Sequence, residues 1–267
     1  MARVIVVSWG IPLLLGLTYV GGIPFVLLIT AICMGCLSEY FKLQAGLGRH
    51  PDLFLGYVCA VGILCAWAWK PDALAYVLIA SFLTIAIVST LRGRNHDDVT
   101  ATIMSLVYIP LFIGSLIFLR SNGNTELFEL GDGYSLVACI WGTIWTCDIA
   151  AYAIGKAFGT HPLTPKLSPK KTIEGFIAGF VGAMAFMLGW WMLGVVSLDI
   201  AVVAGISIGL VGQLGDLVES SLKRTAGVKD TGSFLPGHGG LLDRFDSLLT
   251  SAPLIALYVA IRSYFNY

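Results

Sequence analysis

Ionisable residues gather in a short stretch near the C-terminus, residues 221–246, of an otherwise apolar chain. Charge at membrane depth is costly, so a cluster of this kind between apolar segments indicates a functional site. Carboxylates suit a hard cation such as Mg²⁺, lysine and arginine suit phosphate, and glycines let the backbone approach a ligand. We therefore expect a site for a cation and phosphate groups. Its eight ionisable residues are Lys223, Arg224, Lys229, Asp230, His238, Asp243, Arg244 and Asp246.

An acidic pair lies just before this stretch. Asp216, Glu219 and Lys223 are spaced i, i+3 and i+7, so they share one face of a helix. Carboxylates within an apolar helix are rare and usually functional, so we predict a functional role for Asp216 and Glu219. The alternative is a structural salt bridge inside the membrane.

Two further carboxylates stand at the start of the last apolar segment. Asp243 and Asp246 are three residues apart, so both could point at one cation, and a helix N-terminus favours negative charge. Mg²⁺ prefers one or two protein carboxylates, several waters and substrate phosphates. Together with Asp216, this pair is a candidate metal site. The alternative is helix capping combined with a pair to Arg244.

A glycine-rich connection links the two acidic pairs. Gly239 and Gly240 allow backbone conformations that other residues resist, and backbone N–H groups of such loops can cradle phosphate. His238 is interpreted either as a hydrogen-bond donor to phosphate or as a loop-forming residue. The pattern predicts a polyphosphate site, whose basic residues would be Lys223, Arg224 and Lys229.

An earlier region carries a second set of polar residues. Asp148, Tyr152 and Lys156 repeat at i, i+4 and i+8, again on one helix face. Lys170 and Lys171 precede the next apolar segment and could bind a lipid head group or a nucleotide phosphate. The alternative is anchoring of the helix by positive charge alone.

The elements that must position these residues are membrane helices. The chain is 57% hydrophobic and 12% charged, about half the charged fraction of a soluble domain, which is about 25%. We predict an all-α polytopic integral membrane protein of about nine transmembrane helices without a separate soluble domain. The predicted spans are 4–20, 23–40, 53–69, 72–91, 99–119, 134–157, 173–194, 199–222 and 245–265.

The spans are predicted to form a single membrane domain, residues 1–267. Residues 1–130 would be a scaffold of N-terminal helices, and residues 134–267 would carry the catalytic motifs. Polar residues outside the clusters, among them Glu39, Lys42, Asp97 and Asp98, are interpreted as solvated connections.

Loop charge predicts the orientation of the chain. Twelve of the 16 lysines and arginines lie in the connections that follow the even-numbered spans. The positive-inside rule places these connections, and with them the charged stretch, in the cytoplasm. The formal net charge is zero, which gives no support to nucleic-acid binding, and we expect none.

Residues 221–246 resemble the signature of the phosphatidate cytidylyltransferases, the CDP-diacylglycerol synthases. The signature reads S-x-x-K-R-x4-K-D-x5-P-x-H-G-G-x-x-D-R-x-D, and the chain fills all of its specified positions. Two shorter motifs, D-x-x-A-Y at residues 148–152 and S-P-K-K-T-x-E-G at residues 168–175, are also similar to the family. The resemblance covers about the C-terminal half. The matching residues are Ser221, Lys223, Arg224, Lys229, Asp230, Pro236, His238, Gly239, Gly240, Asp243, Arg244 and Asp246.

The resemblance implies that CTP and phosphatidate give CDP-diacylglycerol and pyrophosphate in a Mg²⁺-dependent reaction of phospholipid biosynthesis at the inner membrane. Mg²⁺ would lie on Asp216, Asp243 and Asp246. Glu219 and Asp230 would hold a second cation or orient the basic residues. The phosphates would be bound by Lys223, Arg224, Lys229 and Arg244.

Two other functions stay open at this point. A CTP-dependent lipid kinase would need a general base for a lipid hydroxyl, and its product would differ. A cation-coupled transporter would use the same acidic residues, but transporters usually show inverted repeats and none is visible. The expected partners are CTP, phosphatidate and membrane lipid, and a homodimer is left open.

Overall fold

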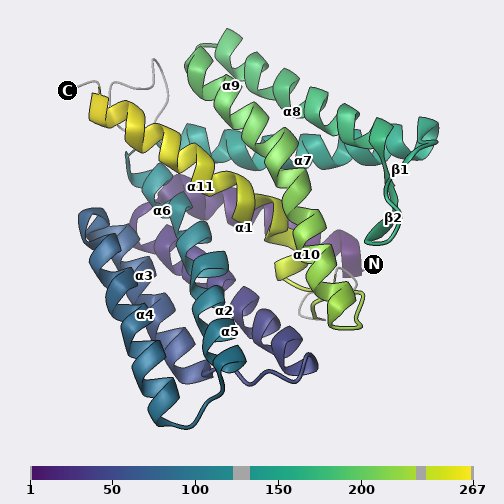
Figure 1. Ribbon diagram of the computed structural model, residues 1–267. Coiled ribbons are helices and arrows are strands. Elements are labelled where there is room, and N and C mark those ends of the chain that lie inside the picture. The colour runs from purple at the N-terminus through teal and green to yellow at the C-terminus, as the bar shows by residue number, and fades with distance from the viewer. Residues whose placement is uncertain (1, 123–132, 233–238, 266–267) are drawn as a thin grey trace. The chain divides into compact units, whose positions relative to one another are not determined.

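The computed structural model describes residues 2–122, 133–232 and 239–265, with side chains from residue 8 onward, and it is almost entirely helical (Figure 1). Each of the nine predicted spans coincides with a helix or with two helices joined by a π-helical turn. The helices are α1 Ala2–Val20, α2 Gly22–Gly46, α3 Leu53–Trp69, α4 Leu74–Leu91, α5 His96–Leu106, α6 Phe112–Asn122, α7 Gly133–Phe158, α8 Ile173–Met192, α9 Leu198–Ile206, α10 Gln213–Thr225 and α11 Leu242–Phe265.

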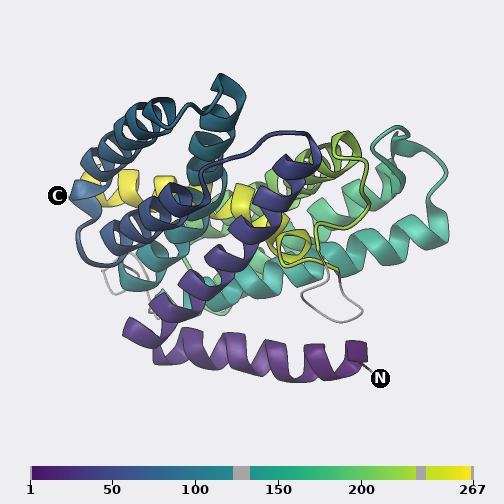
Figure 2. The same cartoon turned by 90° about the horizontal axis from the view of Figure 1, so that it is seen from below.

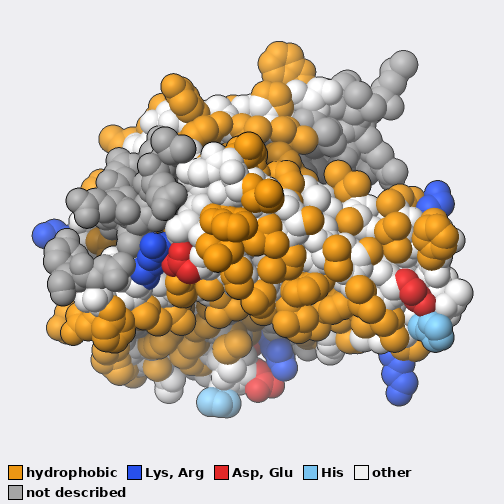
Figure 3. Space-filling model, turned by 90° about the horizontal axis from the view of Figure 1, so that it is seen from above, with side chains coloured by type: hydrophobic (Ala, Val, Ile, Leu, Met, Phe, Trp, Pro, Cys, Tyr) orange, Lys and Arg blue, Asp and Glu red, His pale blue; other side chains and the backbone are white. Residues whose placement is uncertain are grey.

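Seven helical segments among the described residues are long and apolar enough to cross a membrane. The described part of α1 and all of α3 are apolar but shorter. Hydrophobic side chains cover most of the face seen in Figure 3, and charged ones are few. An exposed apolar surface of this extent suits lipid rather than water. The predicted polytopic all-α membrane fold is therefore confirmed.

Two π-helical turns interrupt long helices. Val107–Leu111 lies between α5 and α6 and contains Pro110, which cannot donate a helical hydrogen bond. Ser207–Gly212 lies between α9 and α10. π-helical turns inside α-helices are frequent at functional sites, and the second one directly precedes the helix that carries Asp216.

The chain forms two compact units. Unit 1 comprises Met1–Phe118 and Leu222–Arg244, and unit 2 comprises Leu119–Ser221 and Phe245–Tyr267. Both α10 and α11 therefore begin in one unit and end in the other. The prediction of one membrane domain, with a scaffold half and a catalytic half, stays a prediction.

In unit 1, glycines and buried acids set the path of the chain. Figure 2 shows a sharp turn between α1 and α2, where Gly21 and Gly22 have φ of 66° and 53°, a region that favours glycine. Farther along, α3 and α4 lie side by side (Figure 1).

Asp98 was predicted to be a solvated connection, and that prediction was wrong. Its side chain is buried, and its Oδ1 accepts a hydrogen bond from His50 N at 2.5 Å. Nearby, Asp52 caps α3 and pairs with Arg92 Nη1 at 2.7 Å. The bonds to Asp98 and Arg92 tie the connection between α2 and α3 to the start of α5 and the end of α4, while the local Asp52 cap satisfies a first-turn N–H of α3.

In unit 2, α7 and α8 pack along each other, and a short hairpin projects where α7 ends and α8 begins (Figure 1). Its strands are β1 Pro162–Thr164 and β2 Ser168–Thr172, paired antiparallel. Glu174 fixes the hairpin base, because its Oε1 bonds Thr160 Oγ1 at 2.8 Å and His161 Nδ1 at 2.6 Å. The sequence predicted lysines with a possible phosphate-binding role in this segment, but no strands.

Candidate active site

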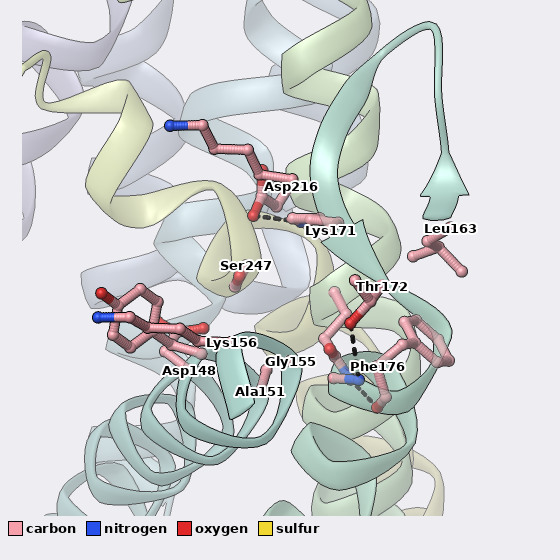
Figure 4. Close-up of a pocket in the computed structure, with 14 residues that line it drawn as sticks. Asp148, Ala151, Gly155, Lys156, Leu163, Lys171, Thr172, Phe176, Asp216 and Ser247 are labelled. Carbon is pink, nitrogen blue, oxygen red and sulfur yellow. Dashed lines mark hydrogen bonds and ion pairs between the residues drawn. The ribbon is translucent and has the colours of Figure 1, made fainter. Parts of the chain in front are cut away.

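A pocket of about 570 Å³ lies in unit 2 (Figure 4). The helix face predicted from spacing, with Asp148, Tyr152 and Lys156, lines one side, and Lys170 and Lys171 approach from β2. The structure thus brings the helix face and the two lysines together, although they lie in separate segments of the sequence. The remaining lining residues are Ala151, Gly155, Leu163, Thr172, Gly175, Phe176, Gln213, Asp216 and Ser247.

The start of α8 holds β2, the strand that carries Lys170 and Lys171, against α7. Thr172 is the N-cap, and its Oγ1 accepts a hydrogen bond from Gly175 N at 3.2 Å, a common way to satisfy a first-turn N–H. A Cβ on Gly155 would lie 3.0 Å from Thr172 Oγ1 and 3.3 Å from Gly175 Cα. Glycine at this position therefore permits the close approach that places β2 at the pocket.

Asp216 lies where the pocket meets the acidic residues of α10. Its Oδ2 forms an ion pair with Lys171 Nζ, as Figure 4 shows, and its Oδ1 accepts a bond from Ser220 Oγ at 3.4 Å. Gln213, one turn earlier, donates from Nε2 to Phe176 O at 3.0 Å and to Gly209 O. These bonds tie α10 to α8 beside the pocket.

Three carboxylates of unit 2 form an acidic triad. Asp216, Glu219 and Asp246 each place one oxygen so that the three atoms lie within 4.8 Å of one another. Glu219 is 1% exposed and Asp246 is 8% exposed. Buried like charges this close need a countercharge, and oxygen ligands suit a hard divalent cation. The donor set therefore fits such a cation.

Apart from Ser221, the remaining signature residues belong to unit 1, where Asp243 accepts hydrogen bonds from several donors. Its Oδ1 pairs with Lys223 Nζ at 2.6 Å. Its Oδ2 accepts hydrogen bonds from Thr231 N at 3.1 Å and from Gly240 N at 2.9 Å. Asp243 thereby holds a lysine and both flanks of the glycine-rich connection. Its predicted role as a metal ligand stays a prediction.

The other predicted phosphate-binding residues are at the surface of unit 1. Arg224, Lys229 and Arg244 are exposed, as is the predicted cation ligand Asp230, and Arg224 Nη1 donates to Val228 O at 3.2 Å. His238 lies outside the described residues, as does Pro236. Gly239 has φ of 80°, so its predicted backbone freedom is in use.

Glu39 was predicted to be a solvated connection, and this was wrong. It is 3% exposed and accepts hydrogen bonds from Thr231 Oγ1 at 2.7 Å, from Leu241 N at 2.9 Å and from Leu242 N at 2.8 Å. A signal was present, because Glu39 stands within an apolar helix, the setting that drew attention to Asp216.

Comparison with known proteins agrees with the signature. A family model described as "Cytidylyltransferase family" matches residues 1–262. A protein of Bacillus subtilis (strain 168) is 33% identical over 263 residues, covering 92% of this chain and 93% of the relative. A protein of Staphylococcus saprophyticus is 37% identical over 240 residues, covering 82% and 85%. Both relatives are named phosphatidate cytidylyltransferase.

Proposed function

We propose, from the premise that the chain belongs to the cytidylyltransferase family, that it converts CTP and phosphatidate into CDP-diacylglycerol and pyrophosphate. The relatives carry this activity in their names. The match over residues 1–262 extends the resemblance well beyond the C-terminal half in which the motifs lie.

The proposed reaction exchanges one phosphoanhydride bond for another. An oxygen of the lipid phosphate bonds to the α-phosphorus of CTP, and the bond from that phosphorus to the β-phosphate oxygen breaks, so pyrophosphate leaves. The phosphate monoester is largely ionised at neutral pH, so no general base is required. Catalysis of such a transfer consists mainly of positioning the reactants and stabilising charge.

The position of Asp216 gives the strongest support for this proposal. Asp216 belongs both to the acidic triad and to the lysine-lined pocket. A cation ligand and a phosphate-binding surface thus share a residue, as expected where substrate phosphates complete the coordination of Mg²⁺. The pocket alone would suit many anions, and the triad alone would suit many cations.

We assign the described residues as follows. Lys170, Lys171 and Lys156 bind phosphate oxygens in the pocket, and Lys171 exchanges its bond to Asp216 for a bond to the substrate. Asp216, Glu219 and Asp246 hold Mg²⁺, which when bound neutralises charge on the nucleotide phosphates. In unit 1, Lys223 and Arg244, with Arg224 and Lys229, bind the polyphosphate, beside the predicted cation ligands Asp230 and Asp243.

The orientation of the chain belongs to the same proposal. The excess of lysine and arginine in the connections after even-numbered spans favours a cytoplasmic active site. CTP is a cytoplasmic metabolite, so this orientation gives it access, whereas phosphatidate arrives from the bilayer. A cysteine introduced at Lys229 should react with an impermeant thiol reagent only from the cytoplasmic face.

The activity is tested with detergent-purified protein, phosphatidate and CTP labelled either at the α- or at the γ-phosphate, with and without Mg²⁺. We expect α-label in the lipid phase, γ-label in pyrophosphate, and no product when Mg²⁺ is chelated. Transfer of γ-label to a polyprenol would instead identify a CTP-dependent kinase. No labelled lipid from folded protein would contradict both enzymatic functions.

A further inference from the structure

Glu39 of α2 binds the signature segment from almost two hundred residues away in the chain. Its Oε1 accepts from Leu241 N at 2.9 Å, and its Oε2 accepts from Leu242 N at 2.8 Å and from Thr231 Oγ1 at 2.7 Å. We propose that Glu39 is a positioning residue that fixes the first turn of α11 for cytidylyl transfer. This inference rests on the function proposed above.

The first turn of α11 needs such a partner. Helix α11 begins at Leu242, and the first N–H groups of a helix have no acceptor within the helix. Glu39, on a different helix, accepts from the first of these, Leu242 N, and from Leu241 N, which directly precedes the helix. Its negative charge also lies at the helix end where the backbone dipoles favour it. An uncharged side chain would satisfy fewer donors and would lack the favourable charge.

The glycines around the segment match the place that Glu39 occupies. A Cβ on Gly232 would lie 2.6 Å from Glu39 Oε1, and a Cβ on Gly240 would overlap both Thr231 Oγ1 and Glu39 Oε2. Gly240 has no φ in the left-handed region, so backbone conformation does not require glycine there. The nearby Thr231 hydroxyl and the Glu39 carboxylate that it binds do require glycine. This accounts for a signature position that a phosphate cradle alone leaves unexplained.

Glu39 affects the site because it fixes the turn that carries Asp243. Asp243 is the second residue of α11, so the turn that Glu39 holds also sets the direction of the Asp243 carboxylate. That carboxylate pairs with Lys223 Nζ and accepts hydrogen bonds from Thr231 N and Gly240 N. Glu39 itself is 3% exposed and touches no substrate in this assignment, so its effect on the reaction is indirect.

Glu39→Gln is the informative substitution, because it keeps the size of the side chain. A carboxylate accepts from all three donors, whereas an amide offers one oxygen and turns its NH2 group toward at least one N–H donor. Gln44→Ala is the matched control. Gln44 is also buried on α2, but it accepts a hydrogen bond from Arg49 Nη1 at 3.0 Å and not from the signature segment.

Two readouts on the full-length protein separate positioning from general stability. The first is amide hydrogen exchange at Leu241 and Leu242, which needs no activity. The second is the steady-state rate of CDP-lipid formation. We expect Glu39→Gln to accelerate exchange at these amides and to lower kcat by about 10- to 100-fold, the range found for residues that orient metal ligands, with a smaller change in KM for CTP. Gln44→Ala should leave both readouts near wild type.

If amide exchange at Leu241 and Leu242 is unchanged in Glu39→Gln, Glu39 does not hold the first turn of α11. If exchange is faster but kcat stays at the wild-type value, this turn does not matter for the reaction. If wild-type protein forms no CDP-lipid, the proposed function fails, while the exchange data still decide whether Glu39 holds the turn. Should Glu39→Gln not fold, Thr231→Val removes one of the three bonds and should show faster exchange with a smaller loss of kcat. Wild-type exchange in that variant would contradict the proposal.

Discussion

Each unit contains an ion pair between lysine and aspartate, and the two pairs lie in different surroundings. In unit 2 the side chains of Lys171 and Asp216 are 30% and 33% exposed and border the pocket. In unit 1 the side chains of Lys223 and Asp243 are 12% and 9% exposed, and Asp243 accepts two further hydrogen bonds from backbone. An exposed pair contributes little to stability, whereas separating a buried pair is costly.

This difference suggests a division of tasks. The pair in the pocket can be exchanged at low cost for a bond to substrate phosphate, so its residues should govern substrate binding. In the pair of unit 1, Asp243 holds backbone in place as Glu39 does. Its loss should therefore affect turnover and local order, in addition to the phosphate binding assigned to Lys223. Substitutions in the acidic triad, in the buried pair and in the exposed pair should therefore differ in their effects on kcat, KM and stability.

Removing a carboxylate from the triad should have the largest effect. Asp246→Asn keeps the size of the side chain but removes its charge. We expect kcat to fall at least about 100-fold, because a cation at such a site supplies several kcal/mol of charge stabilisation. Initial rates measured over a Mg²⁺ titration would show it. Asp199→Asn is the control, since Asp199 lies in the same unit and accepts from Tyr258 OH at 2.6 Å. An equal loss of kcat in both variants would argue against a role of the triad in the reaction.

Breaking the buried pair of unit 1 should affect both stability and turnover. Lys223→Met and Asp243→Asn should each lower the free energy of unfolding by up to about 3 kcal/mol, because each leaves a mostly buried group without its partner. The double variant should regain part of this stability. We expect it to regain no activity, because both residues are assigned to the reaction. Recovery of kcat in the double variant would show that the pair is only structural.

Removing the exposed lysine of the pocket should separate binding from stability. Lys171→Ala should raise KM for the substrate whose phosphate it holds by about tenfold or more, the value of a hydrogen bond to a charged group. The free energy of unfolding should change by less than about 1 kcal/mol. Lys166 lies between the two strands and does not line the pocket. The Lys166→Ala variant should therefore keep the wild-type KM for the same substrate. Similar KM values for the two variants would argue against a pocket role for Lys171.

The smallest effect on activity is expected where glycine lets helices approach. A Cβ on Gly175 would lie 2.7 Å from Ala151 O, so Gly175→Ala should destabilise the protein by about 1–3 kcal/mol through overpacking. Gly189→Ala, also on α8, meets nothing within 4 Å and should be neutral or stabilising by up to about 1 kcal/mol. Thermal unfolding in detergent compares the two. A stable Gly175→Ala variant would mean that the wall of the pocket can adjust.

Features that depend on residues close in sequence could be predicted from the sequence. The nine apolar spans correspond to helices because burial in lipid requires continuous apolar stretches. The face formed by Asp148, Tyr152 and Lys156 does line a pocket, since a helix fixes which side chains share a side. The i, i+3 spacing of Asp216 and Glu219 likewise places them in one cluster.

Features that depend on distant contacts could not be predicted in this way. Asp246 was predicted to share a cation site with Asp216 and Asp243. That its oxygen lies close to those of Asp216 and Glu219 results from tertiary packing, which no local spacing encodes. The role of Glu39 requires Leu241 and Leu242, which follow about two hundred residues later. At the base of the β1–β2 hairpin, Glu174 contacts Thr160 and His161, more than ten residues earlier in the chain.

Cytidylyl transfer from CTP to the lipid phosphate can be followed with phosphatidate that carries ¹⁸O in its phosphate group. The products are separated, and ³¹P NMR locates the isotope. Attack of the lipid phosphate on the α-phosphorus should give ¹⁸O in CDP-diacylglycerol, including the oxygen that bridges the two phosphorus atoms, and pyrophosphate without ¹⁸O. Isotope in pyrophosphate, or CDP as the nucleotide product, would contradict attack of the lipid phosphate on the α-phosphorus.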